Sequence, residues 1–175
     1  AIWWYNRLRR PGVDLDSFRQ PYLDELQSYY AGIGREIWAL DLTHDFGVPV
    51  YAALSRRIDH PVEDLVFAFG AHLDPKIALL RAFTEMNQFM PAVLLRDAEG
   101  NTVYTYKDRE LLRWWQEERL EAHPFLQPAV GALDGPALAA LAQVVLVVVQ
   151  PEHERLGVGR PVDGHARVGA QLDQA

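Results

Sequence analysis

The segment at residues 69–88 constrains the fold most, because it carries a complete helix start followed by a long amphipathic pattern. Asp74 is a natural N-cap residue, and Pro75 suits the first helical position, where the amide hydrogen has no partner to lose. Apolar residues then recur at steps of three and four, which predicts a helix with one buried face over residues 74–90. A chain with this helix must also supply an apolar surface on which it packs.

The other face of this predicted helix is polar. Arg81, Thr84, Glu85 and Gln88 follow the spacing i, i+3, i+4, i+7 and therefore form one stripe. An arginine and a carboxylate in such a row are able to hold a polyphosphate and its magnesium ion. The same spacing also describes an ordinary i, i+4 ion pair between Arg81 and Glu85 on a solvated face, and spacing alone favours the ion pair.

Size and composition indicate one globular domain. The chain has 175 residues, 49% of them hydrophobic, which is enough to bury a core. Its net charge of −7 and its lack of basic clusters argue against nucleic acid as a partner. No apolar run is long enough to span a bilayer, and the aliphatic run at residues 144–149 predicts a buried strand.

The absence of cysteine excludes disulfides, thiolate zinc sites and cysteine nucleophiles. This composition is typical of a cytoplasmic protein, and we expect that location.

Periodicity and turn residues predict an α/β fold, with α+β as the alternative, in which a mixed sheet is backed by helices. We expect Asp16 or Ser17 to cap the first long helix. A short turn separates the first two strands, which predicts a hairpin. The expected helices cover residues 18–30, 74–90 and 107–121, and the expected strands cover residues 36–42, 48–54 and 65–69.

The two ends of the chain differ in character. The sequence begins without Met inside an aromatic run, so we expect a piece of a longer chain in which Trp3 and Trp4 finish a helix or strand. Exposed tryptophans on the folded chain, at positions 3, 4, 114 or 115, would favour a scaffold role. We expect residues 1–130 to belong to one domain and residues 131–175 to form a divergent or poorly ordered tail.

Two histidines lie close to an aspartate. His44 precedes Asp45, and His72 lies two residues before Asp74, so each pair offers a base with an orienting carboxylate. Both pairs fall in predicted turns, where capping of backbone amides is the commoner role. A metal site formed by His72, Asp74 and Glu85 is conceivable and depends on how the chain folds.

The sequence Phe-Gly-Ala-His-Leu-Asp at residues 69–74, running into Arg-Ala-Phe-Thr-Glu-Met-Asn-Gln at residues 81–88, closely resembles the third nucleotide-binding motif of the YcaO family. The segments at residues 3–11, 40–50 and 115–128 resemble the branch of that family that makes thiazole and oxazole peptides. The resemblance covers about residues 1–128, in order, and is to the C-terminal part of such proteins.

This resemblance implies an ATP-dependent cyclodehydratase of natural product biosynthesis. Such enzymes convert Cys, Ser or Thr of a ribosomal precursor peptide to azolines after phosphorylation of the amide oxygen. By residue match, Arg81 would contact the ATP phosphates, Glu85 would bind Mg²⁺, and Gln88 would line the same pocket. A partner protein that binds the leader peptide is also implied. The catalytic residues and a homo-oligomeric state stay open.

The resemblance is incomplete, because the first two acidic nucleotide-binding stretches of the family would precede Ala1. We therefore expect the 175-residue chain by itself to bind ATP weakly or not at all. Two alternatives remain open. The chain is a non-catalytic remnant or scaffold module, or it belongs to a relative that forms thioamides or amidines.

Overall fold

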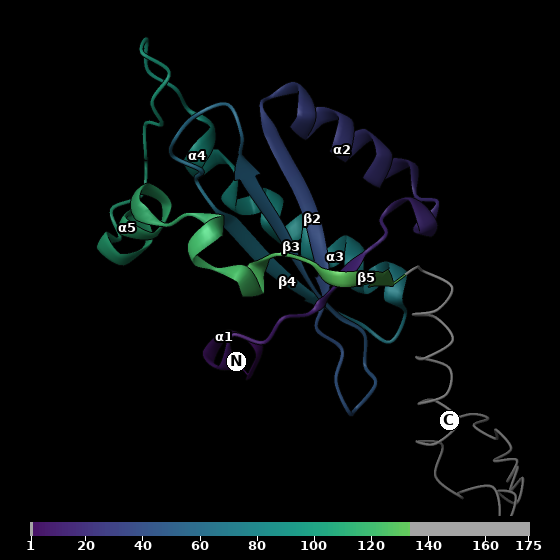
Figure 1. Ribbon diagram of the computed structural model, residues 1–175. Coiled ribbons are helices and arrows are strands. Elements are labelled where there is room, and N and C mark those ends of the chain that lie inside the picture. Colours follow the sequence, from purple (N-terminus) through teal and green to yellow (C-terminus); the bar gives the residue numbers. More distant parts are fainter. Residues whose placement is uncertain (1, 134–175) are drawn as a thin grey trace, which may run out of the picture.

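The computed structural model describes residues 2–133, and a five-stranded sheet forms their centre (Figure 1). The strands are β1 (Pro11–Val13), β2 (Arg35–Asp41), β3 (Val50–Arg57), β4 (Val66–Ala71) and β5 (Ala129–Leu133). The helices are α1 (Ile2–Asn6), α2 (Pro21–Gly32), α3 (Pro75–Phe89), α4 (Pro91–Leu94) and α5 (Arg109–Glu117). Short 3-10 turns cover Asp16–Phe18, Leu120–Ala122 and Pro124–Leu126.

The strand order is β4-β3-β2-β1-β5, in which the first four strands are antiparallel and β5 runs parallel to β1. The predicted hairpin is confirmed, since all of β2 pairs with β3, with Ala39 opposite Ala53. The mixed sheet backed by helices is confirmed as well. Its antiparallel centre makes the α+β alternative the better description.

Helices α2 and α3 pack on one face of the sheet (Figure 1). Small residues such as Ala53 and Ala68 on this face let α3 approach closely. The approach is tightest at Gly70, where an added Cβ would lie 2.2 Å from the carbonyl oxygen of Ala78 and 2.4 Å from the amide nitrogen of Ala82. Only glycine allows this contact between a strand and a helix backbone.

The opposite face of the sheet carries a second apolar cluster. It gathers the aromatic N-terminus and the turns after α5 on strands β2, β3 and β4. The buried members are Trp3, Leu40, Ala52, Leu54, Leu65, Leu120, Phe125 and Leu126. The indole nitrogen of Trp38 donates to the carbonyl oxygen of Leu126 at 2.8 Å, which ties these turns to the sheet.

A buried polar cluster closes one end of the sheet. The carboxylate of Asp64 is fully buried and accepts hydrogen bonds from Thr102 Oγ1 and Tyr104 Oη, each at 2.6 Å. Arg96 lies 3.7 Å from the same carboxylate, and Arg35 donates to the main-chain oxygen of Asp64 at 2.7 Å. These bonds offset the cost of placing charges inside the fold.

The start of α3 is as predicted, whereas the expected cap of the first long helix is wrong. Asp74 accepts a hydrogen bond from the amide of Lys76 at 2.8 Å. Helix α2 begins at Pro21 after Gln20, which makes no side-chain cap. Pro21 fixes the first helical position, and Asp16 instead accepts a hydrogen bond from Gln27 Nε2.

The last predicted helix ends earlier than expected, at Glu117, because Glu63 accepts a hydrogen bond from the amide of Leu120 and holds the chain in a separate turn. The expected domain limit at residue 130 falls inside β5. The predicted strand at 144–149 lies outside the described residues. Within residues 2–133, no helix is both long and apolar enough to cross a membrane.

Candidate functional site

The polar stripe lies on the exposed side of α3. The side chains of Arg81, Thr84, Glu85 and Gln88 are all exposed, and the opposite side of the helix is buried. Thr84 Oγ1 donates to the carbonyl oxygen of Leu80 at 2.8 Å, so its hydroxyl is occupied by the helix itself. Arg81, Glu85 and Gln88 are left to face an incoming molecule.

Arg81 and Glu85, both within the described residues, do not form the i, i+4 ion pair that their spacing favours. Arg81 Nη1 instead donates to the carbonyl oxygen of Ala71 at 3.2 Å, at the end of β4. No ion pair of Glu85 occurs within this part of the chain. The carboxylate of Glu85 is therefore available to a cation from outside the described residues.

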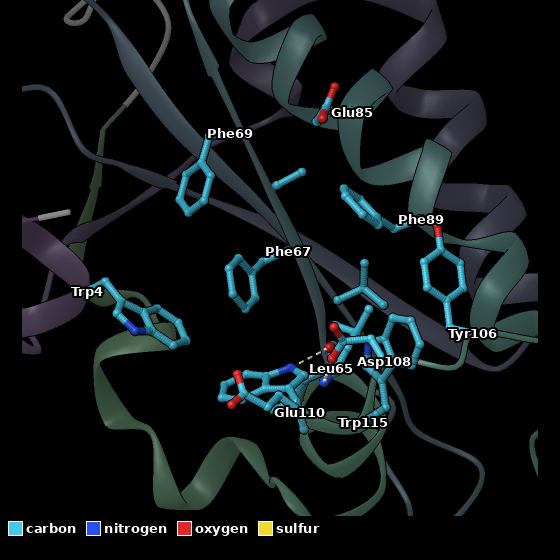
Figure 2. A pocket seen from close by; sticks show the side chains of 14 residues that line it. Trp4, Leu65, Phe67, Phe69, Glu85, Phe89, Tyr106, Asp108, Glu110 and Trp115 are labelled. Atoms are coloured by element: carbon cyan, nitrogen blue, oxygen red, sulfur yellow. Dashed lines mark hydrogen bonds between the residues drawn. The ribbon is translucent and has the colours of Figure 1, made fainter. Parts of the chain in front are cut away.

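Glu85 stands at a groove of about 760 Å³ beside β4 (Figure 2). Figure 2 shows Glu85 and Phe89 on the α3 side, with Asp108 and Glu110 on the α5 side. The walls are mainly apolar. The remaining lining residues are Trp4, Leu65, Val66, Phe67, Ala68, Phe69, Tyr106, Leu111, Trp114 and Trp115.

The groove is held together by contacts between distant segments. The ring of Phe67 lies 5.0 Å from that of Trp4 and 5.7 Å from that of Trp114, measured between ring centroids. Trp114 Nε1 also donates to the carbonyl oxygen of Leu65 at 2.8 Å. Helices α1 and α5 are thereby fixed beside β4, and the groove wall is rigid where the aromatic rings meet.

The conceivable metal site of His72, Asp74 and Glu85 is wrong. His72 Nδ1 accepts a hydrogen bond from the amide of Asp74 at 2.9 Å, and Asp74 caps α3. The capping role predicted for this pair is therefore confirmed. Among the described residues, no three His, Asp or Glu side chains come together in a way that could hold a metal ion.

His44 and Asp45 form a contact of 2.6 Å between Nδ1 and Oδ1 on an exposed turn. The hydrogen bond with His44 lowers the pKa of the Asp45 carboxyl. Neither side chain lines the groove. Their position in the structure gives no support to a role as base and orienting carboxylate.

The sequence predicted the polar stripe of α3 but not most of the residues that line the groove. The alternation of Phe67, Ala68 and Phe69 is a signal that the two rings share one face of a strand. Nothing in the sequence joins Trp4 or Trp114 to that face, because their contacts cross more than 40 residues of chain.

The model of the family described as YcaO cyclodehydratase, ATP- and Mg²⁺-binding, matches residues 1–150. A solved structure described as a heterocyclase in complex with substrate and cofactor is similar at a TM-score of 0.71 and 38% identity, over 89% of this chain and 21% of that one. The heterocyclase TruD is similar at a TM-score of 0.67 and 32% identity, over 88% of this chain and 21% of its own.

Two curated relatives are each 31% identical to this chain. One is an uncharacterised protein in the tfuA 3′ region of Rhizobium leguminosarum bv. trifolii, matched over 59% of this chain and 26% of its own length. The other is an uncharacterised protein of Methanothermobacter thermautotrophicus, matched over 66% and 30%. The chain thus spans less than a third of the length of these relatives.

Proposed function

The chain belongs to the YcaO family, and from this premise we propose that it forms one wall of an ATP-dependent cyclodehydratase site that closes rings in a ribosomal precursor peptide. The substrate residues are Cys, Ser or Thr, and the products are azolines. The proposal extends to a longer cytoplasmic protein that works with a leader-peptide-binding partner.

The observation that carries the proposal is the exposed stripe of α3, with Glu85 free of ion pairs in the described chain and Arg81 fixed at the end of β4. Arg81 neutralises charge on the phosphates, Glu85 supplies a hard oxygen ligand to Mg²⁺, and Gln88 lines the same pocket one turn further along. Because all three residues lie in one continuous helix, their backbone positions keep a fixed spacing.

ATP supplies the phosphoryl group that turns an amide oxygen into a good leaving group. The side-chain thiol or hydroxyl of the substrate loses its proton as its sulfur or oxygen adds to the preceding carbonyl carbon. The resulting oxyanion takes the γ-phosphoryl group from ATP, which leaves as ADP. Phosphate then leaves as the C=N bond forms, and the amide nitrogen loses its proton. Arg81 would stabilise directly the negative charge that develops during the transfer, and Glu85 would do so through the Mg²⁺ ion that it helps to hold.

The described residues fit this site only in part. Glu85 is one carboxylate, and residues 2–133 contain no cluster of three groups able to hold a metal ion. Most Mg²⁺ ligands must therefore come from outside residues 2–133. We expect the 175-residue chain alone to bind Mg-ATP weakly or not at all.

The exposed tryptophans that would favour a scaffold role are not found in the described residues. Trp3 and Trp115 are buried, and Trp4 and Trp114 are partly buried, so the exposed tryptophan patch that would favour a scaffold does not form. The thioamide and amidine alternatives share the same pocket and differ in the nucleophile. All three reactions expel the amide oxygen. A thioamide makes the peptide heavier because sulfur replaces oxygen, whereas ring closure to an azoline makes it lighter by the mass of water. A fragment spectrum that shows whether a Cys, Ser or Thr side chain was consumed separates an azoline from a ring-closing amidine.

Calorimetric titration of Mg-ATP tests the proposal. The titrated proteins are this chain and a hybrid in which the chain replaces the matched segment of the heterocyclase with 38% identity. We expect the hybrid to bind, Glu85→Gln to abolish binding, and Glu110→Gln, a matched carboxylate of the same groove, to leave it unchanged. If the Glu85→Gln hybrid binds Mg-ATP with unaltered affinity, the polar stripe of α3 is only a solvated helix face.

A further inference from the structure

Strand β4 is an edge of the sheet in the described part of the chain, with β3 as its single neighbour. The amide of His72 donates to the carbonyl oxygen of Pro49 across the β3–β4 ladder. Since the direction of main-chain groups alternates along a strand, the odd-numbered residues from 65 to 71 direct their N–H and C=O groups away from β3.

Side chains of the same molecule occupy both ends of this outward row. Trp114 Nε1 donates to the oxygen of Leu65 at 2.8 Å, and Arg81 Nη1 donates to the oxygen of Ala71 at 3.2 Å. Between these two bonds, the outward main-chain groups of Phe67 and Phe69 have no hydrogen-bond partner within residues 2–133. The free stretch has the length of a short strand, about 20 Å from residue 65 to residue 71.

The groove described above runs along this free stretch (Figure 2). Phe89 stands on its α3 side, and Trp4 and Trp114 stand on its other side. The Phe69 side chain is 46% exposed, although its strand neighbours are buried. Free main-chain groups lined by apolar walls are what an added β-strand requires, because the strand gains hydrogen bonds and its side chains gain apolar contacts.

The charges of the groove disfavour a second copy of the chain as the occupant. Its lining includes the carboxylates of Glu85, Asp108 and Glu110 and no lysine or arginine. Pairing of two β4 edges would bring these acidic groups together, and the chain as a whole carries a net charge of −7. The chain also spans only 21% of the length of the similar heterocyclases, so most of the surrounding protein lies outside it.

We propose that the free edge of β4 docks a β-strand from the part of the YcaO domain that lies outside these 175 residues. The added strand pairs with Phe67 and Phe69 and runs between the bonds made by Arg81 and Trp114. It places its apolar side chains against the aromatic walls and brings the remainder of the domain beside Glu85. This inference concerns assembly and holds whether or not the pocket binds ATP.

Amide hydrogen exchange on the 175-residue chain and on the heterocyclase hybrid tests the proposal. In the chain alone, the amides of Phe67 and Phe69 should exchange readily, whereas those of Ala68 and Gly70 should be protected by β3. In the hybrid, the protection of Phe67 and Phe69 should rise by at least about 10-fold.

A proline separates strand pairing from loss of a side chain. Phe67→Pro removes an outward amide that β3 does not use, so in the chain alone it should lower the Tm no further than Phe67→Ala does. In the hybrid, Phe67→Pro should abolish the protection of Phe69, and Phe67→Ala should preserve it.

Four results would overturn the proposal. The first is protection of Phe67 and Phe69 in the monomeric chain, which means that its own residues already cover the edge. The second is protection that appears only as the chain dimerises, which makes a second copy the occupant. The third is an edge that stays unprotected in a folded hybrid. The fourth is protection in the hybrid that Phe67→Pro leaves intact.

Discussion

Gly70 and Ala78 touch through their main chains: a methyl group at Gly70 would lie 2.2 Å from the carbonyl oxygen of Ala78. The contact sets how closely α3 lies on β4. Any side chain at position 70 must therefore push the helix and the strand apart.

Gly70→Ala should destabilise the fold by about 1–3 kcal/mol, because the added carbon overpacks a backbone contact that cannot relax by rotating a side chain. Gly32→Ala is the control, since its added carbon meets nothing within 4 Å, and it should leave stability unchanged or raise it by up to about 1 kcal/mol. Urea unfolding of both variants measures the difference. Equal midpoints would show that the contact is not tight.

Asp64→Asn should destabilise the protein by about 3–5 kcal/mol, because the buried guanidinium of Arg35 and the nearby Arg96 would lose their negative partner. The exposed Asp45→Asn should change stability by less than about 0.5 kcal/mol. Thermal unfolding of the two variants is the measurement. A small loss for Asp64→Asn would mean that the arginines find other partners.

Two tyrosines, the buried Tyr51 and the half-buried Tyr104, should respond in opposite ways to loss of their hydroxyls. Tyr51 Oη is buried without a hydrogen-bond partner in the described residues, so Tyr51→Phe should be neutral or stabilising by up to about 1 kcal/mol. Tyr104 Oη donates to the Asp64 carboxylate, and Tyr104→Phe should cost about 1–3 kcal/mol. Urea midpoints compare them, and a larger loss for Tyr51→Phe than for Tyr104→Phe would contradict this account.

The fold should lose stability as the pH rises above about 10, the ordinary pKa of tyrosine. Burial raises the pKa of Tyr30, Tyr51 and Tyr104, so the unfolded chain releases protons that the folded chain keeps, and unfolding becomes more favourable. Burial lowers the pKa of Arg35 to about 10, which acts in the opposite direction, but one arginine opposes three tyrosines.

Urea unfolding at pH values from neutral to alkaline checks this prediction. Removal of one of the shifted groups by Tyr51→Phe should make the alkaline loss of stability shallower. Stability that stays constant above pH 10 would show that the tyrosines ionise in the folded chain.

Local signals in the sequence were enough for the parts of the fold that local chemistry decides. Asp74 and Pro75 fix the start of α3, and the periodicity of that helix separates its buried face from its polar stripe. The cap of α2 was not predictable in the same way, because two residues able to cap competed with Pro21, which sets the first turn by its fixed φ angle.

The groove depends on contacts that local patterns do not encode. Trp4 and Trp114 contact Phe67 only after the sheet has formed. In the same way, Arg81 reaches the carbonyl oxygen of Ala71 instead of Glu85 only because β4 lies beside α3. Both arrangements follow from the order of the strands, which a single sequence with alternating apolar residues leaves open.

The close main-chain contact at Gly70 fixes the distance between α3 and β4. Because main-chain atoms rather than side chains determine the height of α3 above β4, the positions of Arg81 and Glu85 are independent of which aromatic residues line the groove. Substitutions among the aromatic wall residues should therefore alter the shape of the groove without moving the backbone positions of Arg81 and Glu85.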